Sequence, residues 1–165
     1  ERLTQIRGIG NVKAIQLKCI GELAKRIAAT SRREQITLQS AKSIAEYFME
    51  QLRHETQEHL MLAMFDNKSM LIGEKLLSTG TSNAALISAR DIYRTALQYQ
   101  AAYVVVLHNH PSGNPEPSRE DILVTRKIKA CGELLDILLM DHIIIGDNRY
   151  FSFREQDILF EKGRE

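Results

Sequence analysis

The sequence has 165 residues, 44% of them hydrophobic and 26% charged, with a formal net charge of +1, which is the composition of an ordinary globular protein with one core and a small appendage. It contains neither an apolar run of about eighteen residues nor an N-terminal charged-then-apolar segment, so we expect no membrane span and no export signal. Cys19 and Cys131 are far apart and form no C-x-x-C pair, so we expect reduced thiols and a cytoplasmic protein.

Basic residues are concentrated at the start of the chain. Residues 1–33 hold eight Lys and Arg against two Glu, a net charge of +6, which leaves −5 for residues 34–165. The run Gly8-Ile9-Gly10 precedes a stretch with the periodicity of an amphipathic helix, whose apolar positions are Val12, Ile15, Ile20, Leu23 and Ile27. Because glycines allow close backbone approach and a helix N-terminus favours a phosphate, Gly8, Gly10 and Lys13 are candidate contacts for the phosphates of a polyanion. The alternative is a simple turn that caps a helix.

This N-terminal pattern resembles the second half of a helix-hairpin-helix, a module that binds DNA phosphates. The first half is missing, so we expect the chain to be part of a longer protein that contacts DNA through this segment. Residues 1–33 would then be a partial helix-hairpin-helix. The polar residues 30–35 predict a linker, and residues 40–165 predict a second, larger domain.

The remaining elements alternate between strands and helices. A helix is expected at 41–53 with Ser40 as its N-cap, and a hairpin with strands at 59–65 and 70–78. Further helices are expected at 89–100 and 118–134, the first with Ser88 as N-cap, and further strands at 103–107, 137–145 and 150–153. This order predicts a mixed sheet flanked by helices, an α/β (α+β) fold.

The segment His108-Asn109-His110-Pro111-Ser112-Gly113 carries the strongest chemical signal. It follows the apolar run 103–107, which has the character of a buried strand. Side chains at i and i+2 of a strand project to the same face, so His108 and His110 are placed to share one metal ion. Asp121, in the first turn of the next helix, adds a carboxylate. Two histidines and one carboxylate leave a fourth position for water, as in catalytic zinc sites.

These residues also have structural interpretations. Ser118 and Asp121 have the spacing of a helix N-cap and its N3 partner, so they could serve only the helix. The two histidines could be ordinary polar residues at a strand end. His142, which follows Asp141 in an apolar strand, could support the site, although we favour a purely structural role for it. Capping and metal binding are compatible in any case.

The run from His108 to Asp121 resembles the metal-binding motif of JAMM (MPN) domains, in the form found in the bacterial RadC family, and the resemblance extends from about Glu58 onward. It implies a JAMM/MPN (cytidine-deaminase-like) architecture with one catalytic Zn²⁺ held by His108, His110 and Asp121. It also implies that Ser118 stabilises an oxyanion and that an upstream glutamate is the general base. Glu58 is the best candidate for this base, and Glu74 on the next strand is its rival.

Three functions are compatible with these residues. The first, implied by the resemblance, is a zinc-dependent hydrolase of the metallopeptidase or isopeptidase type that acts on a peptide or protein substrate. The second is a non-catalytic, DNA-associated accessory protein with a structural or vestigial metal site, in line with the family's association with DNA repair. The third, a nuclease, is less favoured because a single-metal site suits that reaction less well than a two-metal site.

Overall fold

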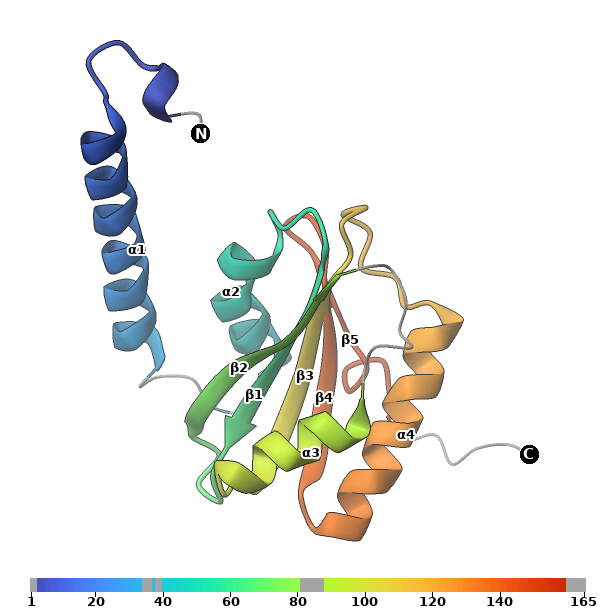
Figure 1. Cartoon of the computed structure of the whole chain (residues 1–165). Coiled ribbons are helices and arrows are strands. Elements are labelled where there is room, and N and C mark those ends of the chain that lie inside the picture. The colour runs from blue at the N-terminus through green and yellow to red at the C-terminus, as the bar shows by residue number, and fades with distance from the viewer. Residues whose placement is uncertain (1–2, 34–36, 38–39, 81–87, 160–165) are drawn as a thin grey trace. The chain divides into compact units, whose positions relative to one another are not determined.

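The computed structural model describes residues 3–33, 37, 40–80 and 88–159, and the chain divides into two compact units, Glu1–Gln35 and Ile36–Glu165 (Figure 1). The first unit contains a short 3-10 helix, η1 (Leu3–Gln5), and a long helix, α1 (Asn11–Arg33). The expected linker at residues 30–35 is therefore wrong for residues 30–33, which are helical, while residues 34–35 lie outside the described residues. Arginine has a high intrinsic helix propensity, so a helix that ends in two arginines is compatible with this sequence.

The second unit is built on a five-stranded mixed sheet with the strand order β2-β1-β3-β4-β5. Antiparallel pairs join β1 to β2, β1 to β3, and β4 to β5, whereas β3 and β4 are parallel. The strands are β1 (Glu58–Phe65), β2 (Leu71–Gly80), β3 (Tyr103–Asn109), β4 (Leu138–Ile145) and β5 (Tyr150–Ser152). This confirms the expected mixed α/β fold and places β3 at the centre of the sheet.

Three helices cover the two faces of the sheet: α2 (Ala41–Leu52), α3 (Ala89–Gln98) and α4 (Arg119–Leu135). Buried side chains of α2 pack with alternate residues of β1, β3 and β4 in one hydrophobic cluster. The other cluster joins α3 and α4 to the opposite face, so the unit has three layers (Figure 1). Because β3 is covered on both faces, its sequence is an uninterrupted apolar run rather than an alternating one.

The capping residues predicted for these helices are confirmed. Ser40 and Ser88 accept hydrogen bonds from backbone amides three residues on, and Ser118 does the same at the start of α4. The expected bounds differ from the observed ones by a residue or two, which is the usual uncertainty at the ends of such elements. Among the described residues, no helix combines the length and the apolar character needed to cross a bilayer.

Candidate metal centre

The three proposed ligands meet where β3 ends and α4 begins. His108 is the penultimate residue of β3, His110 follows the strand, and Asp121 lies in the first turn of α4. His108 and Asp121 are each only 4% exposed. The helix α4 connects β3 to the parallel strand β4, so α4 begins near the carboxyl end of β3. Ligand sites in such folds form at this end of the strands.

The distances between the candidate ligand atoms match a tetrahedral metal site. His108 Nε2 and His110 Nε2 are 3.1 Å apart. Asp121 Oδ1 is 3.4 Å from His108 Nε2, and Asp121 Oδ2 is 3.6 Å from His110 Nε2. Ligands bound at about 2.0–2.1 Å in tetrahedral geometry are roughly 3.3–3.4 Å apart, so these separations need little adjustment to accept zinc.

The hydrogen bonds of His110 direct a lone pair at this centre. Its Nδ1 lies 2.8 Å from the backbone carbonyl oxygen of Asn114, which can only accept. Nδ1 therefore carries the ring proton in the neutral imidazole, and Nε2 bears the lone pair. A second ring nitrogen that donates to a carbonyl is the usual arrangement of metal-bound histidines.

A chain of buried hydrogen bonds fixes the ring of His108 in the same way. The Thr125 hydroxyl donates to the Asp121 carbonyl oxygen at 2.5 Å, so it accepts from His142 Nδ1, which is 2.6 Å away. His142 Nε2 is then an acceptor, and it lies 2.9 Å from His108 Nδ1, which must donate. Nε2 of His108 is left with its lone pair facing His110. Two such lone pairs at 3.1 Å repel unless a cation or proton lies between them, so the donor set fits a metal ion.

His142 thus contacts a candidate ligand directly, which is the supporting position that we had ranked below a purely structural role from the sequence. The register of the parallel pair places His142 opposite Val106, on the sheet face covered by α3 and α4. Its ring stacks on Phe153 with centroids 4.9 Å apart and an interplanar angle of 13°. The side chain is fully buried, so its hydrogen bonds to His108 and Thr125 are shielded from water.

The ionisation states suit a metal site at neutral pH. Burial lowers the pKa of His108 to about 4, which keeps this ring neutral. The hydrogen bond with Asp121 raises the pKa of His110 against the effect of burial. Burial also raises the pKa of Asp121, but its hydrogen bonds with His110 and with the hydroxyl and amide of Ser118 outweigh burial and hold the pKa well below its usual range. Asp121 is therefore an anion at neutral pH.

Ser118 and Asp121 also form the capping box that their spacing predicts. The Ser118 side chain accepts from the Asp121 amide at 3.1 Å, and Asp121 Oδ2 accepts from the Ser118 amide at 2.8 Å. The Ser118 hydroxyl donates to the same Oδ2 at 2.6 Å. Capping and the ligand position therefore coexist, because one carboxylate oxygen serves the helix while Oδ1 faces His108.

Glu58 lies beside the candidate ligands. Leu60 pairs with His108, and continuing this antiparallel register places Glu58 opposite His110, on the same sheet face. Burial raises the pKa of Glu58, the charge of His110 lowers it, and the negative charge of Asp121 raises it again. A half-buried carboxylate with a raised pKa is suited to exchange protons near neutral pH.

Asn109, between the two histidines, holds the backbone on both sides of Glu58. Its Oδ1 accepts from the His59 amide at 2.7 Å, and its Nδ2 donates to the Gln57 carbonyl oxygen at 3.0 Å. The side chain is 1% exposed. From the sequence we assigned no role to Asn109, although its position inside the motif is a signal that could have suggested one.

The rival glutamate is far from this centre. Glu74 pairs with Ala63, five positions along β1 from Glu58 and therefore roughly 17 Å away. Ala63 belongs to the cluster on the α2 face, opposite the face that carries His108. The structure therefore separates Glu74 from the ligands in both distance and side of the sheet.

The candidate DNA contacts lie in the N-terminal unit. Gly8 has φ +89°, a conformation that favours glycine, just before α1 begins at Asn11. The Lys13 ammonium donates to the Gly8 carbonyl oxygen at 3.4 Å, so Lys13 lies at the turn as expected. Of the apolar positions predicted for this helix, Val12, Ile15, Ile20 and Leu23 are exposed, with Val12 at 70% and Ile20 at 63%.

The sequence is similar to those of one known protein family. Residues 38–158 match the family of RadC-like JAB domains. The chain is 40% identical over 159 residues to the UPF0758 protein of Clostridium acetobutylicum, an alignment that covers 96% of this chain and 69% of the relative. It is 36% identical to the UPF0758 protein of Desulforamulus reducens and 39% identical to that of Bacillus velezensis, with 96% of this chain and 70% and 69% of the relatives covered.

Proposed function

Because the chain belongs to the RadC-like JAB domain family, we propose that it is a zinc-dependent hydrolase that cleaves amide or isopeptide bonds. The observation that best supports the proposal is the position of Glu58. Its carboxylate shares a sheet face with the cluster of His108, His110 and Asp121 and has a raised pKa. A metal site with only a structural role does not require an acid–base group beside its ligands.

His108, His110 and Asp121 would hold the ion, and the remaining position would be open to water or substrate. When bound, zinc would polarise the substrate carbonyl group and make water easier to deprotonate. The hydrogen bonds that His108 donates to His142 and that His110 donates to the Asn114 carbonyl oxygen keep both imidazoles in the tautomer that the ligand role requires.

Glu58 would move the protons. In its ionised form it would accept a proton from the attacking water, and the protonated carboxyl would then donate to the leaving amine. Asn109 would keep this carboxylate in place through its hydrogen bonds to the backbone of the adjacent residues. Ser118 would donate to the developing oxyanion, which requires its hydroxyl to turn away from Asp121 Oδ2.

The substitution Glu58→Gln tests the assignment, with Glu74→Gln as a matched control that changes the same charge outside the site. Both variants and the wild type are loaded with zinc and screened against peptides and lysine-linked isopeptides. We expect Glu58→Gln to keep zinc but lose at least about 100-fold in rate, and Glu74→Gln to retain activity. Equal, measurable rates in all three proteins would remove Glu58 from the reaction, and zinc-loaded wild type that cleaves nothing would favour the non-catalytic accessory role.

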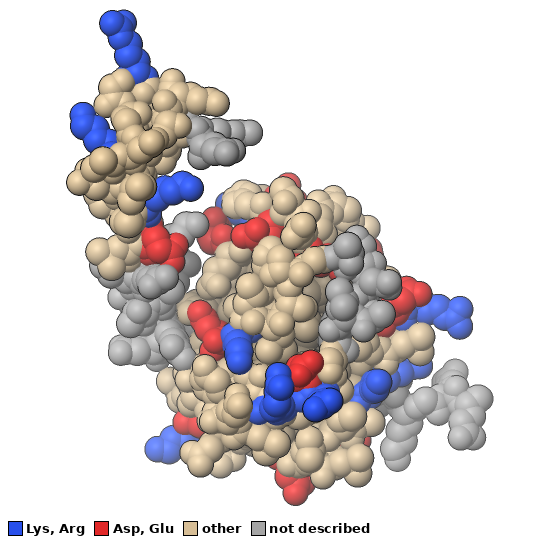
Figure 2. All heavy atoms as spheres, in the orientation of Figure 1, with Lys and Arg blue, Asp and Glu red and all other residues tan. Residues whose placement is uncertain are grey.

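The N-terminal unit supports a second candidate function, contact with nucleic acid. Its sequence carries a net charge of +6 over residues 1–33, and the Gly8 turn leads directly into α1. Lys and Arg side chains project from the described part of this unit (Figure 2). DNA affinity measured by fluorescence anisotropy should fall steeply with salt and be lost when residues 1–33 are deleted. An affinity that survives the deletion would remove the N-terminal unit from DNA binding.

A further inference from the structure

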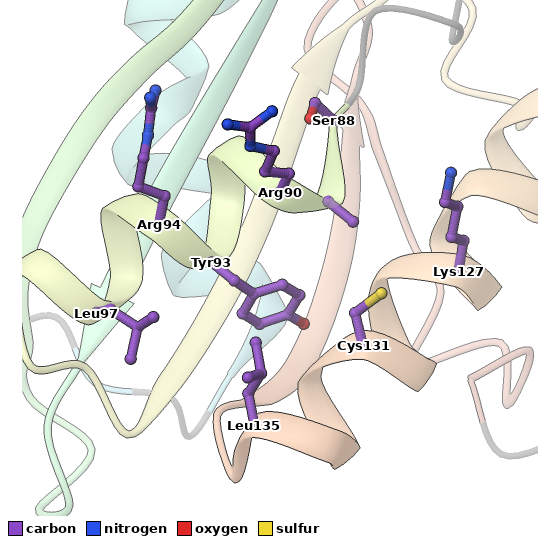
Figure 3. A pocket seen from close by; sticks show the side chains of 9 residues that line it. Ser88, Arg90, Tyr93, Arg94, Leu97, Lys127, Cys131 and Leu135 are labelled. Carbon is purple, nitrogen blue, oxygen red and sulfur yellow. The ribbon is translucent and has the colours of Figure 1, made fainter.

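A groove of about 660 Å³ lies between α3 and α4, away from the candidate metal centre (Figure 3). From α3, the stripe Arg90, Tyr93, Arg94 and Leu97 faces it, with the spacing of one helix side. From α4, Lys127, Cys131 and Leu135 face it at intervals of four residues. Lys127 follows Asp121 by six residues, about 9 Å along the helix axis, so the groove and the metal centre are separate sites on one helix.

The floor of the groove is apolar and firmly built. The Tyr93 hydroxyl donates to the Ile128 carbonyl oxygen at 2.8 Å, so only the ring of this tyrosine is presented to the groove. Tyr93 packs tightly on α4, because a Cβ added to Gly132 would collide with its hydroxyl oxygen. The walls are not closed: Leu97 is 57% exposed and Leu135 is 45% exposed. Large exposed leucines beside a fixed apolar floor are typical of an interaction surface.

The groove has a cationic end and an apolar end. Arg90 and Lys127 lie on opposite sides of the end nearest Ser88, whereas Leu97 and Leu135 lie at the other end (Figure 3). Arg94 pairs with Asp91 at 3.0 Å, but no ion pair of Arg90 or Lys127 is formed within the described residues. Lys and Arg side chains also gather on the surface over α3, with acidic groups among them (Figure 2). An occupant with both carboxylates and apolar side chains would complement this distribution.

The dimensions favour a helix as that occupant. From Arg90 to Leu97 the groove follows α3 for about 10 Å, and from Lys127 to Leu135 it follows α4 for about 12 Å. Three apolar side chains at i, i+3 or i+4, and i+7 of a helix span about 10 Å, which is the same length. A small molecule would have most of its surface enclosed in its site, and half-exposed leucine walls do not provide that enclosure.

We propose that the groove between α3 and α4 binds an acidic amphipathic helix of a partner protein. Its apolar stripe lies on Tyr93 between Leu97 and Leu135, and its carboxylates face Arg90 and Lys127. This surface is independent of hydrolysis at the metal centre, so it functions as a docking site whether or not the protein is an enzyme.

The test uses a fluorescein-labelled synthetic helix with leucines at i, i+4 and i+7 flanked by glutamates, titrated with the whole chain in an anisotropy assay. A second peptide replaces every glutamate with glutamine. Arg90→Glu/Lys127→Glu should weaken binding of the acidic peptide about tenfold, whereas Lys68→Glu/Lys75→Glu, with the same charge change at exposed residues outside the groove, should leave it within about twofold. The glutamine peptide should bind more weakly than the acidic one.

A leucine pair tests the apolar contact. Leu135→Ser should weaken binding about fivefold, while Leu134→Ser, at a neighbouring residue of α4 that is 86% exposed, should have no effect. Circular dichroism melting confirms that each variant is folded. The proposal is overturned if both peptides bind alike or the groove variants bind as wild type. It is equally overturned if decanoate, a small molecule with one carboxylate and an apolar chain, occupies the groove and the peptide does not. A dimer in light scattering that the groove variants dissociate would overturn it too.

Discussion

His142→Leu is expected to weaken zinc binding although His142 is not a ligand. In the structure His142 Nε2 accepts from His108 Nδ1 at 2.9 Å, and its other ring nitrogen bonds Thr125. Leucine fills similar space but offers no acceptor. The ring of His108 then either keeps a buried N–H without a partner or moves its proton to Nε2, where it blocks the metal.

The size of the effect follows from the burial of these groups. His142 is fully buried and His108 is 4% exposed, so water does not replace the lost hydrogen bond. Leaving one buried donor unsatisfied costs about 1–3 kcal/mol. This corresponds to roughly a five- to 150-fold loss of affinity, in the range observed when residues that support metal ligands are replaced. His142→Gln should recover most of the affinity, because its amide offers an acceptor to His108 and a donor to Thr125.

Zinc affinity is measured by competition with a fluorescent chelator, and the tautomer of His108 by nitrogen-15 NMR of the metal-free protein. Ile144→Val, a conservative change at another buried residue of β4, serves as the control and should bind zinc as wild type does. In the wild type we expect the His108 proton on Nδ1. A leucine variant with wild-type affinity and an unchanged tautomer would refute the reasoning.

Three further predictions follow from single residues. Asn109→Ala should lower the hydrolytic rate about tenfold with zinc affinity within twofold, since it releases the backbone beside Glu58; a matching loss of zinc would contradict this. Gly132→Ala should lower the free energy of unfolding by about 1–3 kcal/mol in urea titrations, because the new methyl group collides with Tyr93. A stabilised variant would show that α3 and α4 move apart to accommodate the methyl group. Burial raises the pKa of Asp141 to about 6. The folded state therefore keeps a proton on Asp141 that the unfolded state releases near pH 4. The contribution of this group to stability is then lost as pH rises from about 4 to 6. The difference in unfolding free energy between wild type and Asp141→Asn should change by about 3 kcal/mol across that window. A difference that stays constant with pH would show that Asp141 does not cause the pH dependence of stability.

The parts of the site that could be predicted from sequence are those set by local geometry. The i, i+2 spacing places His108 and His110 on one strand face, and the Ser118–Asp121 spacing places a carboxylate in the first helical turn. Both depend only on the periodicity of one element and its cap. The apolar run before His108 likewise predicts a buried strand.

The supporting residues could not be predicted, because they depend on contacts between elements. His142 reaches His108 only through the register that pairs Val106 with His142 in the parallel strands. Thr125 reaches His142 only because α4 packs on that sheet face. Neither the register of parallel strands nor the rotation of a crossover helix is encoded in a local pattern. The same limit applied to the end of α1, where a polar composition suggested a linker although residues 30–33 continue the helix.

Zinc binding to the metal-free protein, followed by calorimetry and by X-ray absorption at the zinc edge, tests the central claim most directly. The account predicts one ion per chain, with two imidazole nitrogens and a carboxylate oxygen at about 2.0–2.1 Å, and loss of binding in His108→Ala and Asp121→Ala. Zinc held equally well by these two variants, or a coordination shell without imidazole, would contradict it.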